Sequence, residues 1–112
     1  MQDKSIPAAT QLLWQGRQTV EEVRGLVASL KESVAVELQL PPDLHHTLYA
    51  RLYPQATGEA VEEVALEGGA ELLRRIEDLP GIDGLAAVRE LVEQEGLKVR
   101  IVSPGPTIIL YS

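Results

Sequence analysis

Residues 97–111 read LKVRIVSPGPTIILY, and this stretch decides the fold. Apolar residues at positions 97, 99 and 101 alternate with Lys98 and Arg100, which is the period of a strand with one buried face. The Ser-Pro-Gly-Pro segment that follows predicts a turn, and residues 107–111 predict a second strand, so that the two form an antiparallel hairpin. The run Ile108–Leu110 is apolar on both faces, which predicts a strand in the centre of a sheet or at a dimer interface.

A third strand is predicted upstream, over residues 34–40 (VAVELQL). The apolar residues at even positions point to one face, while Glu37 and Gln39 point to the other. Pro41 and Pro42 end this strand, because proline cannot donate a hydrogen bond to a neighbouring strand.

The N-terminal segment, residues 6–30, has apolar residues at 13, 20, 23, 27 and 30, which is helical spacing. Pro7 suits the first turn of a helix, and Thr19 with Glu22 has the form of a capping box. The segment is predicted as one long helix, or as two helices with a break near Gly16. We take residues 1–18 as an N-terminal arm or helix and residues 19–112 as a single α+β domain.

Two later helices are predicted from apolar stripes. Leucines at 44, 48 and 52 follow Asp43, which is placed to cap that helix. Apolar residues at 85, 88, 91 and 92 follow Asp83, a second candidate cap, and Gly96 stands where a left-handed C-cap glycine belongs.

Residues 59–79 are open to two interpretations. Their apolar stripe favours two helical pieces hinged at Gly68 and Gly69, since consecutive glycines are costly inside a helix. The alternative is a short strand over residues 61–66 followed by a helix over residues 70–79.

These elements predict an α+β fold with helices packed on one face of a small, mostly antiparallel three-stranded sheet that ends in a C-terminal β-hairpin. So narrow a sheet has exposed edges, and exposed edges invite pairing with another chain.

Composition excludes several classes of function. The chain has no cysteine, so disulfides and cysteine-ligated metal sites are excluded. The net charge of −7 disfavours binding to the phosphate backbone of nucleic acids and to anionic lipid. Asp43 and His46 share a helix face but supply only half a metal site, and no serine lies in a G-x-S-x-G context. We expect no enzyme activity, no cofactor and no metal, and we expect a cytoplasmic protein, because no secretory signal or membrane span is visible.

One local motif suggests nucleic-acid binding. Residues 81–84, Gly-Ile-Asp-Gly, lie between two predicted helices, and a strand follows the second. This arrangement resembles the helix–GxxG–helix–strand core of KH domains, which bind single-stranded nucleic acid, over about a third of the chain. The resemblance implies contacts from the following residues: Gly81, Gly84, Arg89, Lys98 and Arg100. Asp83 departs from the pattern, because its charge would face the phosphates.

Residues 34–52 are also similar to the opening of ribbon-helix-helix repressors, although Glu37 has the wrong charge for the face that enters DNA.

The remaining class is an interaction module. The aromatic residues are Trp14, Tyr49, Tyr53 and Tyr111, and such residues often anchor interfaces. Trp14 has a second interpretation, in which it covers the protein's own core. We therefore expect a non-catalytic protein-interaction or assembly subunit that self-associates or binds a protein partner, with KH-like nucleic-acid binding as the alternative.

Overall fold

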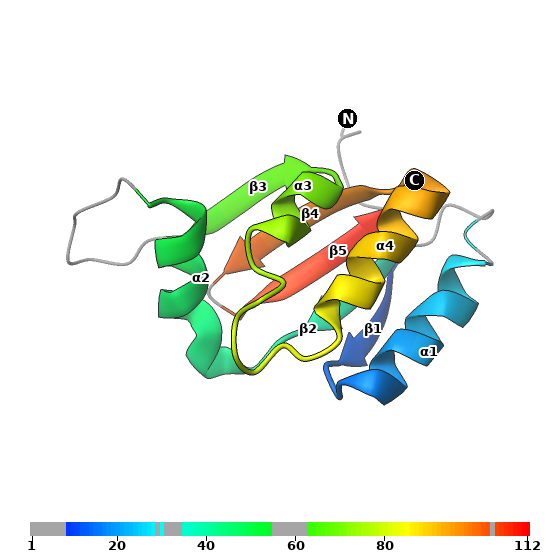
Figure 1. Ribbon diagram of the computed structural model, residues 1–112, viewed down its shortest axis with the longest axis horizontal. Coiled ribbons are helices and arrows are strands. Elements are labelled where there is room, and N and C mark those ends of the chain that lie inside the picture. The colour runs from blue at the N-terminus through cyan, green and yellow to red at the C-terminus, as the bar shows by residue number, and fades with distance from the viewer. Residues whose placement is uncertain (1–8, 29, 31–34, 55–62, 104) are drawn as a thin grey trace.

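The computed structural model describes residues 9–28, 30, 35–54, 63–103 and 105–112 of the chain. Its five strands form one sheet in the order β1-β2-β5-β4-β3 (Figure 1). Their bounds are β1 (Ala9–Leu13), β2 (Ala35–Gln39), β3 (Val64–Gly68), β4 (Lys98–Ser103) and β5 (Thr107–Tyr111). β1 runs parallel to β2, and every other neighbouring pair is antiparallel.

The α+β class and the C-terminal hairpin of β4 and β5 are confirmed, but the expectation of three strands is wrong. The sheet is mixed and has two additional strands, β1 and β3, which form its edges. β5 lies in the centre, as the apolar run Ile108–Leu110 predicted.

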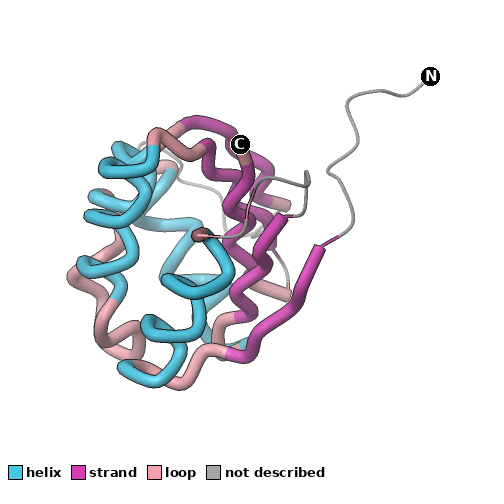
Figure 2. The backbone as a smooth tube through the Cα atoms, turned by 90° about the vertical axis from the view of Figure 1, so that its right-hand side faces the viewer, coloured by secondary structure: helices cyan, strands magenta, loops and turns pink. Residues whose placement is uncertain are grey.

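The helices lie together on one face of the sheet, as Figure 2 shows. They are α1 (Arg17–Val27), α2 (His45–Leu52), α3 (Ala70–Arg74) and α4 (Leu85–Glu95), with a 3-10 turn over Pro42–Leu44 before α2. The leucines at 44, 48 and 52 and the apolar stripe of α4 are buried in one aliphatic core, as predicted. None of the described helices has the length and hydropathy that a bilayer crossing requires.

The N-terminal segment differs from its prediction, because Ala9–Leu13 is a strand and only Arg17–Val27 is helical. The break falls at Gly16, whose φ of 70° lies in the left-handed region. Thr19 is therefore inside the first turn and cannot cap the helix. Its hydroxyl instead accepts a hydrogen bond from the Gln15 N–H at 2.5 Å and donates one to the Leu13 carbonyl at 3.1 Å.

Neither aspartate predicted as a cap acts as one. Asp43 lies inside the 3-10 turn, and the residue that caps α4 is Gly84, with a left-handed φ of 91°, rather than Asp83. Among the residues that the structure describes, no side-chain capping hydrogen bond forms at either helix. Gly96 does end α4 in the left-handed conformation, as expected.

The alternative interpretation of residues 59–79 is nearer to the structure, although residues 59–62 lie outside the described part. β3 ends at Gly68 and α3 covers only Ala70–Arg74. A Cβ atom at Gly68 would lie 2.6 Å from a carboxylate oxygen of Glu71 and 3.1 Å from the Leu72 side chain. The first glycine therefore lets α3 pack closely on the end of β3, rather than acting as a hinge between helices.

Candidate functional site

The face of the sheet that points away from the helices is the candidate site, and we call it the open face. Side chains alternate along each strand, and Ile108 and Leu110 of β5 belong to the helix-covered core. Ile109 and Tyr111 therefore point to the opposite side, where Figure 2 shows none of the described helices.

The strand register aligns one open-face residue from each strand into a row that we call the central row. Gln11 pairs with Glu37, Glu37 with Ile109, Ile109 with Arg100, and Arg100 with Glu67. Ile109 sits in the middle with an acidic residue on one side and a basic residue on the other. It is only 7% exposed.

A second row runs beside the first on the same face. Leu13 pairs with Gln39, Gln39 with Thr107, Thr107 with Val102, and Val102 with Ala65. Leu13 is 64% exposed and is the large apolar residue that the described part of the chain leaves in solvent. This row carries no charge.

The open face is electrically balanced, although the whole chain has a net charge of −7. Its strand residues include two acids, Glu37 and Glu67, and two bases, Lys98 and Arg100. Glu37 accepts a hydrogen bond from the Gln11 amide at 3.1 Å, while Arg100 and Glu67 form a loose ion pair at 3.6 Å. The Nε atom of Arg100 is buried and has no hydrogen-bond partner among the described residues.

The four aromatic candidates are not brought together. Trp14 is half-buried against the protein's own core, which is the second interpretation given above for this residue. Tyr49 and Tyr53 pack on each other along α2, with ring centroids 5.0 Å apart, and also contact the core. Tyr111 alone lies half-buried on the open face.

The residues of the KH-like alternative are divided between the two faces of the sheet. Gly81 and Gly84 lie in the helix layer, whereas Lys98 and Arg100 lie on the open face. Arg89 is held by Glu77 at 2.8 Å and by Glu93 at 3.1 Å, and the hydrogen bond to Glu77 raises the pKa of its guanidinium. These bases therefore do not form one groove beside the GxxG turn.

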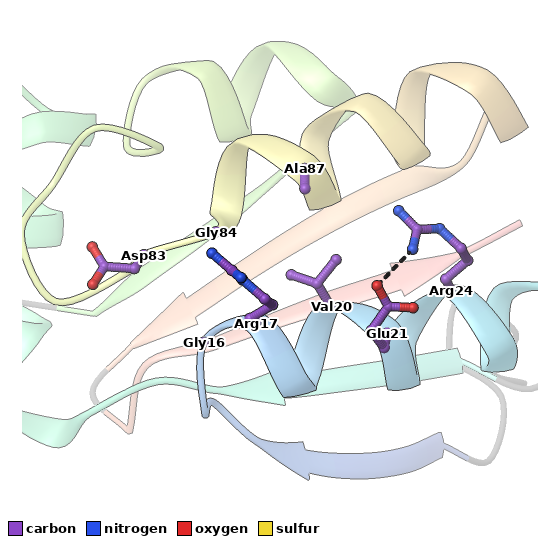
Figure 3. A pocket seen from close by; sticks show the side chains of 8 residues that line it. All are labelled: Gly16, Arg17, Val20, Glu21, Arg24, Asp83, Gly84 and Ala87. Carbon is purple, nitrogen blue, oxygen red and sulfur yellow. Dashed lines mark hydrogen bonds and ion pairs between the residues drawn. The ribbon is translucent and has the colours of Figure 1, made fainter.

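A groove of about 490 Å³ lies where α1 and α4 begin (Figure 3). Gly16 and Gly84 start the two helices there, and Arg17 reaches toward Gly84. Asp83 and Glu21 line the same groove, and Glu21 pairs with Arg24 at 3.2 Å. The mixture of both charge signs gives the groove no preference for a phosphate or for a cation.

The two histidines make contacts within the protein itself. Nδ1 of His45 lies 2.5 Å from the hydroxyl of the buried Ser103, and the His46 ring packs on that of His45. Asp43 and His46 gain no third ligand, because the described residues contain no group of three metal-binding side chains.

The sequence indicated Lys98 and Arg100 as nucleic-acid contacts and Tyr111 as an interface aromatic. It assigned no binding role to Leu13, Glu67 or Gln11. These residues come from both edges of the sheet, and only the strand register places them on one surface. No known protein family, curated protein or solved structure matches the chain.

Proposed function

We propose that this protein is a non-catalytic assembly subunit that self-associates through its open face. The observation that carries the proposal is the charge balance of this face within a chain of net charge −7. Two copies repel each other over most of their surfaces, and the repulsion is smallest where acids and bases are equal in number. The open face is therefore the surface best suited to bind a second copy of the chain.

The apolar content of the face supports the same conclusion. Leu13 is exposed, and Val102 and Tyr111 are half-buried on a side that no described helix covers. Burying them against another copy removes apolar surface from water, which is the main favourable contribution to association.

Sedimentation velocity over a concentration series tests the proposal. We expect the wild-type chain to shift from monomer to dimer between about 10 µM and about 1 mM, the range of a small interface. Val102→Lys places a charge on the open face and should keep the chain monomeric. Ala50→Lys adds the same charge to an exposed position on α2 and should leave the dimer intact.

A wild-type chain that stays monomeric up to about 1 mM would overturn self-association. Equal behaviour of the two lysine variants would place any dimer contact away from the open face.

The nucleic-acid alternative has less support, because its bases lie on separate faces. It is tested by titrating a fluorescently labelled single-stranded RNA with the protein at physiological salt. Saturable binding that changes with Asp83→Lys would favour the alternative over our proposal.

A further inference from the structure

The central row is complementary to itself when it is reversed. Read from β3 to β1 it runs Glu67, Arg100, Ile109, Glu37, Gln11. Its reverse places Gln11 on Glu67, Glu37 on Arg100, and Ile109 on itself. Every charged side chain then meets an opposite charge or an amide.

We propose that two copies pack open face to open face about a two-fold axis that runs parallel to β5 and passes over Ile109. This inference rests on the proposed function and specifies its geometry. Rotation about such an axis exchanges the two sides of the sheet, so that β4 lies over β2 of the second copy and β3 lies over β1. Arg100 then faces Glu37 of the second copy, twice in the dimer.

The second row fits the same axis. Leu13 faces Ala65 of the second copy, Val102 faces Gln39, and Thr107 faces itself. The most exposed apolar side chain of the face is thus covered by another apolar residue. Two sheets that pack face to face align their strands within about 30°, so the three central strands stay opposite their counterparts.

The charges distinguish this axis from the other simple arrangement. A two-fold axis that runs across the strands, along the central row, would place each residue on its own copy. Arg100 would then face Arg100, and Glu37 would face Glu37. Such like-charge contacts oppose association. Of the two axes, only the one along β5 therefore places opposite charges of the central row against each other.

Arg100 has hydrogen-bonding capacity left for a second carboxylate. Its ion pair with Glu67 is loose at 3.6 Å and a third of its side chain stays exposed, so the N–H groups at the end of the guanidinium can take another acceptor. Its Nε is buried and is not one of the donors that a second copy could reach. A guanidinium has five N–H donors and binds carboxylates well in planar, paired geometry. Glu37 of the second copy would supply that carboxylate.

The area of the face indicates how strong the dimer is. Five strands about 4.8 Å apart, with about 3.3 Å per residue, give a patch of roughly 24 Å by 17 Å. Two such patches together fall below the ~1,200 Å² of a standard interface, which corresponds to a weak, reversible dimer.

A charge-swap experiment tests the axis. Glu37→Arg alone places two arginines opposite each other, and Arg100→Glu alone places two glutamates opposite each other. Each variant should therefore dimerise at least about tenfold more weakly than wild type. An equimolar mixture of the two variants restores one opposite-charge contact between the swapped side chains and one between the native ones, and it should form a heterodimer more tightly than either variant forms a homodimer.

Matched controls use exposed helix positions with the same charge changes, Glu90→Arg and Arg17→Glu. Each should dimerise like wild type, and their mixture should show no preference for the heterodimer. Circular dichroism and thermal unfolding of each variant verify that it is folded.

The outcomes separate the axis from the proposed function. If wild type dimerises but the single variants do so equally well, or if the mixture does not recover, the axis is wrong while self-association stands. If wild type does not dimerise, the proposed function itself fails.

Discussion

The hydroxyl of Thr19 donates a hydrogen bond to the backbone carbonyl of Leu13 at 3.1 Å, and so ties α1 to the end of β1. The same oxygen accepts the N–H of Gln15 at 2.5 Å, and the residue is fully buried. One side chain therefore satisfies two backbone groups of the turn that takes the chain from the sheet edge to the helix layer.

Thr19→Val keeps the shape of this side chain and removes both hydrogen bonds. We expect the free energy of unfolding to fall by about 1–2 kcal/mol, because two part-buried backbone groups lose a hydrogen-bond partner whose own side chain is fully buried. Urea denaturation measures the change. Thr47→Val, at an exposed position on α2, should stay within about 0.5 kcal/mol of wild type, and equal losses in the two variants would contradict the role of Thr19.

The start of α4 depends on Gly84, which is the N-cap residue of that helix. Gly84 has a φ of +91°, and a Cβ there would lie 3.3 Å from the Val20 side chain and 3.9 Å from the Gly16 backbone. Gly84→Ala should destabilise the fold by more than about 1 kcal/mol, because it combines a strained backbone with a tight contact.

Gly25 is the matched control, since it lies within α1 and a new Cβ there would meet none of the described residues within 4 Å. Gly25→Ala should stabilise the protein by roughly 0.5–1 kcal/mol, as alanine favours helix over glycine. Opposite signs for the two variants in one denaturation series are the expected result. A gain in both would show that the start of α4 tolerates a side chain.

Much of the helix layer could be predicted from the sequence, because the leucines of α2 and the apolar stripe of α4 repeat at helical spacing. β1 could not, because it is an exposed edge strand with only five residues, and its apolar residues blend into the helical spacing of α1. β3 was obscured by Gly68 and Gly69, which look like a helix break, although the first of them serves close packing on α3.

The candidate site was less predictable than the fold. The central row joins residues from all five strands, as far apart in sequence as Gln11 and Ile109, and no local pattern encodes that register. The apolar run of β5 did indicate a strand in the centre of the sheet, although the described helices cover only one of its two faces. It did not indicate which residues would surround Ile109.

Two exposed carboxylates tie the stability of the fold to pH. A hydrogen bond from Arg51, at 2.7 Å from Asp78, holds the pKa of that carboxyl below its usual value. A hydrogen bond from Arg74, with a further contribution from Arg89, lowers the pKa of Glu93. A lowered folded-state pKa stabilises the protein above the unfolded-state pKa of about 4, and that contribution is lost as the pH falls through the folded-state value.

Asp78→Asn and Glu93→Gln should therefore each reduce the loss of melting temperature between about pH 5 and pH 2. Arg51→Gln should change the pH dependence as Asp78→Asn does, and the double variant should add nothing to that change, because both substitutions remove the Arg51–Asp78 interaction. Arg51→Gln also removes the hydrogen bond from Arg51 to the Arg75 carbonyl at 2.9 Å, but that carbonyl does not titrate. Additive effects of the pair would show that Arg51 is not what lowers the pKa of Asp78.

Ser103 joins β4 to the beginning of α2, through its contact with Nδ1 of His45 at 2.5 Å. The serine is 4% exposed on the helix-facing side of the sheet, so its hydroxyl is removed from most of the solvent. Ser103→Ala should cost about 1 kcal/mol of stability, since one hydrogen bond is lost and the ring nitrogen can regain a water molecule.

Because that bond fastens α2 to the sheet, amide hydrogen exchange over residues 45–52 of the Ser103→Ala variant should accelerate more than exchange within α4. Ser112→Ala, at an exposed position, is the control, and uniform acceleration across both helices would show that the contact does not hold α2 in place.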